Sequence, residues 1–224
     1  MREIVFDTET TGFDPNNGDR VVEIGCVELL NGMPTGKSFH KYLNPKRDMP
    51  ESAFKIHGLS SEFLSDKPLF GEVVEEFLTF VGPDNLVAHN AEFDMKFLNW
   101  EMENAGLQKI PLTRMVDTLK IARSKFPGAK NSLDALCSRF GIDNSNRTLH
   151  GALLDSEILA EVYLELKGGR QAGMDLTVSN SKIAGTLEKK LRNKRIFPPT
   201  VNELKAHKKF LEKISNPIWV KTTS

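Results

Sequence analysis

The chain has few cysteines, few tyrosines and tryptophans, and no long apolar run. Its two cysteines, Cys26 and Cys137, lie in the apolar patterns VVEIGCVELL and SLDALCSRF, which favours free buried thiols over a disulfide and gives no zinc-ligand spacing. No apolar stretch approaches the roughly 20 residues that a membrane-spanning helix needs, and no signal-peptide core precedes the first expected strand. We therefore expect a cytoplasmic globular protein that does not interact with membranes.

The chain also lacks net charge, because 30 Lys and Arg balance 30 Asp and Glu. The distribution is nevertheless uneven: residues 182–224 carry 11 Lys and Arg against 3 Glu, which leaves 19 basic and 27 acidic residues in 1–181. An acidic body repels a polyanion on average, although bound cations reverse the sign locally. A basic tail attracts nucleic acid or an acidic protein surface, so the two parts are expected to do different jobs.

The hydrophobic pattern predicts an α/β fold, with a mixed β-sheet flanked by helices. The expected strands are 3–7, 21–30, 36–43 and 85–89, with a turn around Asn31-Gly32 that this spacing makes longer than two residues. The expected helices are 71–81, 92–105, 117–126, 131–140 and 152–166. Three strands in succession, followed by helices alternating with further strands, indicate a mixed sheet with a site at its strand ends.

The pattern changes after Leu166. The stretch GGRQAGMDLTVSNSK is rich in Gly, Ser, Asn and Gln and is typical of a flexible linker. Residues 182–214 are compatible with helix but are interrupted by Pro198-Pro199.

Four carboxylates and one histidine lie at the ends of the expected elements. Asp7 and Glu9, in DTETTG, are two residues apart and emerge on one face where the backbone is extended. Asp94, in HNAEFD, lies in the first turn of the 92–105 helix, and Asp155, in HGALLD, lies beside an apolar helical stripe and needs a partner. His150 is five residues from Asp155, which puts it off that helix face, so it is expected to approach from the preceding loop.

This set is suited to two divalent cations. Two ions about 3.5–4 Å apart stabilise the attacking and leaving oxygens of an in-line phosphoryl displacement. A neutral histidine with a pKa of about 6.5 can take the proton of the attacking water. Taken singly, each residue has a plainer explanation: a solvated strand end, an acid favoured by a helix dipole, or a capping histidine. Their coincidence in one chain favours a two-metal phosphodiesterase.

The three motifs together resemble the histidine subgroup (DEDDh) of the ribonuclease H-like 3′–5′ exonucleases. The resemblance covers residues 3–166, and Tyr163 lies on the wrong side of the last aspartate for the tyrosine subgroup. It implies two Mg²⁺ or Mn²⁺ ions, a histidine general base and release of nucleoside 5′-monophosphates. The implied metal ligands are Asp7, Glu9, Asp94 and Asp155, and the implied base is His150.

Longer segments, including YLNPKRDMPESAFKIHGLS and FPGAKNSLDALCSRFGIDNSNRTLHGALLDSEILAEVYLEL, are similar to the bacterial DNA polymerase III epsilon subunits, the replicative proofreaders. This resemblance implies a single-stranded or frayed DNA 3′ end as substrate. Besides the metal-site acids Asp7, Glu9 and Asp155, it implicates Thr10 and His57 in substrate binding, whereas without it His57 is an ordinary loop or helix-end histidine. The family usually has an acid five residues before that histidine; here the position is Ser52, with Glu51 next to it, so the contact falls to one of these two.

The resemblance also suggests three parts: an exonuclease domain at 1–168, a linker at 169–181 and a polymerase-binding tail at 182–224. In the linker, Gln171, Met174 and Leu176 resemble the peptide with which bacterial replication proteins dock on the sliding clamp. The basic tail resembles the segment that anchors to the polymerase III alpha subunit, with apolar anchors at Ile196, Phe197, Ile218 and Trp219. Its cations could instead contact DNA phosphates or form a solvated helix face. A small accessory subunit is a further partner left open.

Two other functions fit parts of the sequence. One is a free-standing DEDDh exonuclease that trims the 3′ ends of RNA or short oligonucleotides, which would need neither the clamp peptide nor the tail. The other is a structural bridge between clamp and polymerase, which would not need all five catalytic residues. The proofreading exonuclease accounts for both sets of features.

Overall fold

The structure, a computed structural model, describes residues 1–147, 149–169 and 197–215. The chain divides into two compact units, residues 1–174 and 175–224, and each is considered by itself. Among the described residues, no helix has the length and apolar character required to cross a bilayer.

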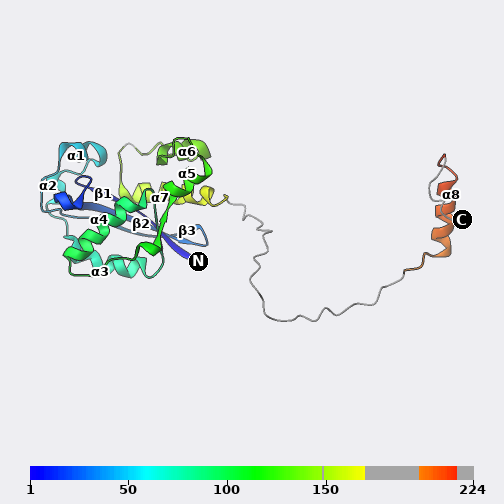
Figure 1. The fold of residues 1–224 in the computed structure, drawn as a ribbon, viewed down its shortest axis with the longest axis horizontal. Coiled ribbons are helices and arrows are strands. Elements are labelled where there is room, and N and C mark those ends of the chain that lie inside the picture. The colour runs from blue at the N-terminus through cyan, green and yellow to red at the C-terminus, as the bar shows by residue number, and fades with distance from the viewer. Residues whose placement is uncertain (148, 170–196, 216–224) are drawn as a thin grey trace. The chain divides into compact units, whose positions relative to one another are not determined.

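The first unit is built on a five-stranded mixed sheet in the order β3-β2-β1-β4-β5 (Figure 1). β1 pairs antiparallel with β2 and parallel with β4, and β4 pairs parallel with β5, so the expected mixed sheet is confirmed. The strands are β1 (Arg2–Thr10), β2 (Val21–Leu30), β3 (Met33–Tyr42), β4 (Asn85–Ala88) and β5 (Met115–Asp117).

Helices cover both faces of this sheet (Figure 1). α3 and α4 contribute to one hydrophobic cluster and α5, α6 and α7 to the other. The helices of this unit are α1 (Glu51–His57), α2 (Ser61–Leu64), α3 (Phe70–Val81), α4 (Ala91–Asn104), α5 (Thr118–Lys125), α6 (Leu133–Phe140) and α7 (Ala152–Leu166), with short 3₁₀ turns η1 (Pro15–Asn17) and η2 (Leu112–Arg114).

The side-chain alternation of β1 decides where the carboxylates face. Ile4 and Phe6 belong to the cluster beneath α3 and α4, whereas Val5 belongs to the cluster beneath α5, α6 and α7. Because successive side chains of a strand point to opposite faces, Asp7 and Glu9 continue the Val5 series. The two acids of β1 therefore lie on the sheet face that α7 covers.

The hairpin between β2 and β3 corrects one expectation. β2 ends at Leu30 and β3 begins at Met33, so the connection is the two residues Asn31-Gly32. Their φ angles are 53° and 80°, as a type I′ turn requires. The longer loop predicted from the sequence was wrong because the first residues of β3 are exposed and lack the apolar alternation that marks a half-buried strand.

Other elements left no clear signal in the sequence. α1, α2 and β5 are seven, four and three residues long, too short to show a hydrophobic period. α7 and β2 have the predicted bounds, and the other predicted helices and strands of this unit are present with shifted ends. In the second unit, the described residues form α8 (Val201–Leu211), which follows the two prolines and begins with a capping box between Thr200 and Glu203.

A glycine allows α7 to lie directly on the sheet. A Cβ at Gly25 of β2 would come within 2.2 Å of the backbone of Ala152 and Leu153, where α7 begins. The hydroxyl of Ser156 lies 2.9 Å from the Gly25 carbonyl and 2.7 Å from the Ala152 carbonyl, so it shares its proton between the strand and the start of α7. Any side chain at position 25 would push this turn, and the residues it carries, away from β1.

We expect Gly25→Ala to lower the free energy of unfolding by about 1–3 kcal/mol, as overpacking of a tight core does. It should also reduce any activity that depends on the start of α7. Denaturant unfolding measures the first effect. Gly71→Ala is the matched control, because a Cβ there meets no atom within 4 Å and Ala favours the helix α3. Equal stabilities of the two variants would contradict the close approach.

Candidate active site

The five residues singled out at the ends of the expected elements line one pocket of about 270 Å³. β1 supplies Asp7 and Glu9, the first turn of α4 supplies Asp94, and the first turn of α7 supplies Asp155. His150 lies in the loop before α7, as its spacing from Asp155 predicted. The tertiary structure thus brings together residues from four separate segments.

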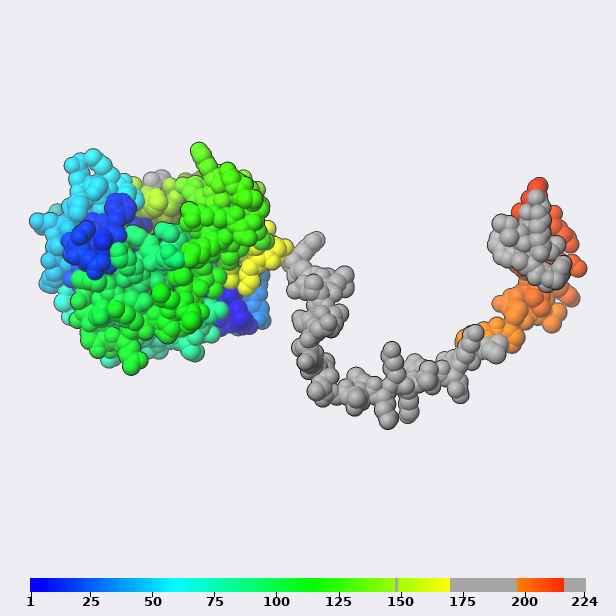
Figure 2. Space-filling view, viewed as in Figure 1, coloured from blue at the N-terminus to red at the C-terminus, as the bar shows by residue number. Residues whose placement is uncertain are grey.

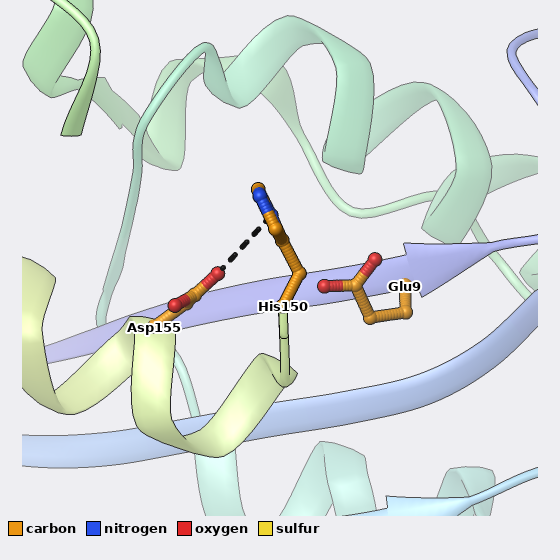
Figure 3. Close-up of side chains that lie close together, drawn as sticks. All are labelled: Glu9, His150 and Asp155. Carbon is orange, nitrogen blue, oxygen red and sulfur yellow. Dashed lines mark ion pairs between the residues drawn. The ribbon is translucent and has the colours of Figure 1, made fainter. Parts of the chain in front are cut away.

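Three of these side chains form the tightest group (Figure 3). Ligand atoms of Glu9, His150 and Asp155 all lie within 4.8 Å of one another, a spacing that one metal ion could bridge. His150 Nδ1 lies 3.5 Å from Asp155 Oδ2. The backbone N–H of His150 donates to the carbonyl of Ile56 over 3.1 Å, which ties the histidine loop to α1.

Asp94 is oriented by Thr8, a residue that the sequence analysis missed. The Thr8 hydroxyl and N–H both donate to Asp94 Oδ1, over 2.7 and 3.2 Å. Thr8 lies between Asp7 and Glu9 but faces the opposite side of β1, toward α4. The alternation of β1 could have indicated this direction, but not the partner, because Asp94 is 86 residues away.

Burial raises the pKa values of three of these acids, and neighbouring carboxylates add to the effect. Burial, followed by repulsion from Asp155, raises the pKa of Glu9 to about 8. Burial raises the pKa of Asp94 to about 7, against the opposing effect of the Thr8 hydrogen bond. Burial and then the charge of Asp94 raise the pKa of Asp7 well above its usual value. A cluster that resists ionisation by itself is well suited to cations that stabilise the ionised form.

These shifts predict how pH acts on the metal-free protein. An acid whose pKa is higher in the folded than in the unfolded state binds more protons when folded, so stability falls as pH rises between the two values. The window runs from about 4 to about 7 for Asp94 and to about 8 for Glu9. We expect the melting temperature in EDTA to fall across this window, and the increase caused by Mn²⁺ to grow. Scanning fluorimetry at several pH values measures both; a Mn²⁺ effect independent of pH would contradict this account.

An arginine that the sequence analysis missed occupies the same pocket. Arg147 forms a two-pronged ion pair with Asp155, through Nε to Oδ1 and through Nη2 to Oδ2, the latter over 2.8 Å. Its Nη1 donates to Asp134 Oδ1, also over 2.8 Å. Only 8% of the Arg147 side chain is exposed. Arg147 therefore supplies a positive charge at a carboxylate predicted to bind metal.

Arg147 also contacts the candidate base. Its Nη2 lies 3.0 Å from His150 Nδ1 and 3.4 Å from His150 Nε2, and because an arginine only donates hydrogen bonds, the imidazole is the acceptor in this contact. Burial, followed by the charge of Arg147, lowers the pKa of His150, which favours the neutral imidazole. Arg147 therefore covers the imidazole of the candidate base in this arrangement.

We expect Arg147→Gln to destabilise the metal-free protein more than the Mn²⁺-loaded protein, because a metal cation can replace the lost charge beside Asp155. The melting temperatures in EDTA and in Mn²⁺ measure this difference. Arg20→Gln is the matched control, since it breaks another arginine–carboxylate pair, with the buried Glu101, away from this pocket. It should lower both melting temperatures equally. The same pattern for Arg147→Gln would contradict the role of Arg147 as a resident cation.

The residues predicted to contact substrate, other than Asp7 and Asp155, line a neighbouring pocket of about 170 Å³. Thr10, Ser52 and His57 all line it, together with the apolar side chains Phe13, Ala53, Ile56 and Phe93. The Thr10 hydroxyl donates to the Gly12 carbonyl over 2.6 Å, so it shapes the turn after β1. His57 is buried, and its Nε2 has no hydrogen-bond partner among the described residues. An unpartnered buried nitrogen at a pocket wall is a candidate ligand contact.

Ser52 and Glu51, the two candidates for a substrate contact at the start of α1, differ in position. Ser52 lines the pocket, whereas Glu51 is exposed and pairs with Lys55 over 2.6 Å.

The predicted clamp-binding residues Gln171, Met174 and Leu176 lie outside the described residues, as do the tail anchors Ile196, Ile218 and Trp219. Phe197 is described and is 81% exposed.

The pocket lined by the four acids and His150, called the catalytic pocket from here on, has donor atoms that fit hard divalent cations. Four carboxylates and one imidazole offer oxygen and nitrogen ligands, and no cysteine lines the pocket. Carboxylate oxygens are the ligands that Mg²⁺ and Mn²⁺ prefer. Burial raises the pKa values of Glu9 and Asp94, and a bound cation would favour the ionised form of both.

Comparisons with known proteins point in one direction. The sequence matches the RNase_T family, described as exonuclease, over residues 4–163. The DNA polymerase III subunit epsilon of Rickettsia typhi is 49% identical over 222 residues, covering 96% of this chain and 97% of the relative. The subunit of the same name from Salmonella typhimurium is 45% identical over 227 residues, covering 94% and 92%.

Solved structures show the same fold. Exonuclease X in complex with 5′ overhanging duplex DNA aligns with a TM-score of 0.59 at 27% identity, over 74% of this chain and 90% of that one. The nuclease domain of 3′hExo, a DEDDh family member bound to rAMP, aligns with a TM-score of 0.64 at 18% identity, over 74% and 90%.

Proposed function

The chain belongs to the exonuclease family and, within it, to the DNA polymerase III epsilon subunits, which are proofreading 3′–5′ exonucleases, and on that premise we propose which residues carry the reaction. Catalysis in this family depends on metal. Asp7, Glu9, Asp94 and Asp155, which line one pocket, would hold two divalent ions, Mg²⁺ or Mn²⁺. The observation that carries this proposal is the convergence of four carboxylates in one pocket with raised pKa values on Asp7, Glu9 and Asp94.

When bound, the two ions stabilise the charge that develops on the attacking and leaving oxygens of the phosphodiester. The remaining steps belong to the protein. His150 accepts the proton of the attacking water on its imidazole, once Arg147 gives up its hydrogen bond to that ring. Thr8 holds the carboxylate of Asp94 in one orientation throughout, because both its donors bind the same oxygen.

The neighbouring apolar pocket takes the 3′-terminal nucleoside of the DNA strand. Phe13, Ile56 and Phe93 offer apolar surface to a base and sugar, and the unpartnered Nε2 of His57 offers a polar contact. Ser52 lines the same pocket at the start of α1. A mismatched terminus reaches this pocket more readily than a paired one, because less free energy is needed to separate it from the template.

The linker and tail attach the exonuclease to its assembly. Gln171, Met174 and Leu176 dock on the sliding clamp, and residues 182–224 anchor to the polymerase alpha subunit in the cytoplasm. Support for the second contact comes from α8, on which Val201, Leu204 and Phe210 are 68%, 53% and 61% exposed. Apolar side chains on a helix without described cover suit a partner pocket.

Release of mononucleotides from paired and 3′-mismatched primers tests the function directly. We expect Mg²⁺-dependent release that is faster from the mismatched terminus and is stimulated by the alpha subunit. Replacing Gln171 and Met174 with Ala should weaken clamp binding while activity on free single strands is kept. Preference for RNA without a response to alpha would overturn the proofreading role.

We expect His150→Gln to lower kcat by about 10²- to 10⁴-fold, which is the usual contribution of a general base. The double variant Asp7→Ala/Glu9→Ala should lose activity and also Mn²⁺ binding, measured by calorimetry. His207→Gln is the matched control, since His207 is an exposed histidine on α8. Near-wild-type turnover by His150→Gln would rule out its role as the base.

A further inference from the structure

A third pocket adjoins the catalytic one on the side away from the nucleoside pocket. It measures about 660 Å³, and its lining includes His89, Asn90, Arg123, Asn131 and Ser132. This third pocket shares His89 and Ser132 with the catalytic pocket. The apolar pocket proposed to take the terminal nucleoside, called the nucleoside pocket, shares Thr8, Glu9 and Phe93 with the catalytic pocket. The three pockets therefore follow one another, with the carboxylates in the middle.

The helices show the same order. α1 and α2 lie on one side of the first unit and α5 and α6 on the other, with α4 between them (Figure 1). The surface of α5 and α6 is uncovered in the view of Figure 2. The nucleoside pocket takes residues from α1, and the third pocket takes residues from α5 and from the loop before α6.

The third pocket differs from the catalytic pocket in charge. Arg123 is exposed at its wall, and no carboxylate of residues 1–147, 149–169 and 197–215 forms an ion pair with it. Lys125 and Lys130 are exposed nearby in sequence. A basic group beside an acidic cluster gives a polyanionic strand an attractive contact on the body, whose residues 1–181 carry 27 acidic and 19 basic side chains.

The wall of this pocket is held by buried hydrogen bonds. His89 bridges two elements, with Nδ1 2.9 Å from the Thr118 hydroxyl and Nε2 2.9 Å from the Asn131 carbonyl. The side-chain amide of Asn131 donates to the carbonyls of Phe126 and Ala129, over 3.3 and 3.0 Å. The loop between α5 and α6 is thus fixed against the end of β4.

Asn131 also has an unused acceptor. The residue is buried, yet its Oδ1 has no hydrogen-bond partner among the described residues. Exchanging the amide oxygen and nitrogen would place an oxygen against two carbonyls, so the present orientation is the favourable one. A buried acceptor beside a pocket calls for a donor, which a base, a sugar hydroxyl or an ordered water can supply.

We propose that this third pocket binds the nucleotide unit that precedes the scissile bond, with Arg123 pairing its phosphate. The inference rests on the proposed function, because it takes the terminal nucleoside to lie in the apolar pocket and the scissile phosphate at the carboxylates. A strand that continues in the same direction reaches the pocket of Arg123 next. Arg123 is then a substrate-positioning residue for strands of two or more nucleotides.

Two substrates separate this contact from the chemistry. A single-stranded DNA oligomer extends into the third pocket, whereas the p-nitrophenyl ester of thymidine 5′-monophosphate has only the terminal unit. We expect Arg123→Gln to lower the ratio of kcat/KM on the oligomer to kcat/KM on the ester by about 10-fold, as loss of one charge-assisted hydrogen bond does. Arg123→Lys, which keeps the charge, should recover most of the ratio.

The matched control is Lys125→Gln, because Lys125 is an exposed cation on the same helix α5 but does not line the pocket. It should leave the ratio as in the wild type. An unchanged ratio for Arg123→Gln, or an equal change for both control and test variants, would overturn the proposal. Failure of the wild type to hydrolyse even the ester would instead count against the proposed function.

Binding provides a readout that does not depend on turnover. With Ca²⁺ in place of Mg²⁺, the affinity for a fluorescent oligomer should fall by about 10-fold in Arg123→Gln. The slope of log affinity against log salt should decrease by about 0.7, the value for one phosphate contact on a single strand. An unchanged slope and affinity would overturn the phosphate contact whether or not the protein is active.

Discussion

The burial of neighbouring carboxylates in one pocket is the constraint on which this site depends. Asp7, Glu9, Asp94 and Asp155 line one pocket, and the pKa values of the first three are raised. Holding such acids together is unfavourable unless positive charge is close. In the structure described, part of that charge comes from Arg147, which pairs with Asp155. The metal ions of the proposed mechanism would supply the remainder, so metal binding and the stability of the catalytic pocket are coupled.

The fold positions these acids through backbone contacts rather than through the acids themselves. α7 can carry Asp155 to the face of Asp7 and Glu9 only because Gly25 leaves no side chain between β2 and the helix. The parallel pairing of β1 with β4 places the start of α4, and hence Asp94, beside Thr8. Both contacts lie in the hydrophobic body, where close packing allows little displacement. Substitutions in this packing are therefore expected to change the positions of the acids, and so the activity, without replacing any of the acids.

The order of the three pockets gives the site a direction. Apolar side chains dominate the pocket on the α1 side, carboxylates the middle, and an arginine the pocket on the α5 side. A nucleic-acid strand presents a base at its end and phosphates along its length, so this order matches a strand entering from one side only. In the proposed mechanism, a body with excess acidic charge would hold a polyanion by local attraction, at the metal ions and at Arg123.

The sequence by itself determined the parts of this protein that depend on local pattern. The alternation of β1 placed Asp7 and Glu9 on one face, and the 3.6-residue period located α7 and put His150 in the loop before it, as the structure confirms. The sequence did not predict Arg147 or Thr8 as neighbours of the four clustered acids, nor the two-residue turn at Asn31-Gly32. Short or exposed segments carry no hydrophobic period, and hydrogen-bond partners 86 residues apart have no local signature. Only the tertiary structure decided which charged groups meet, because their meeting depends on packing between elements. The pairing of Arg147 with Asp155 is one such outcome.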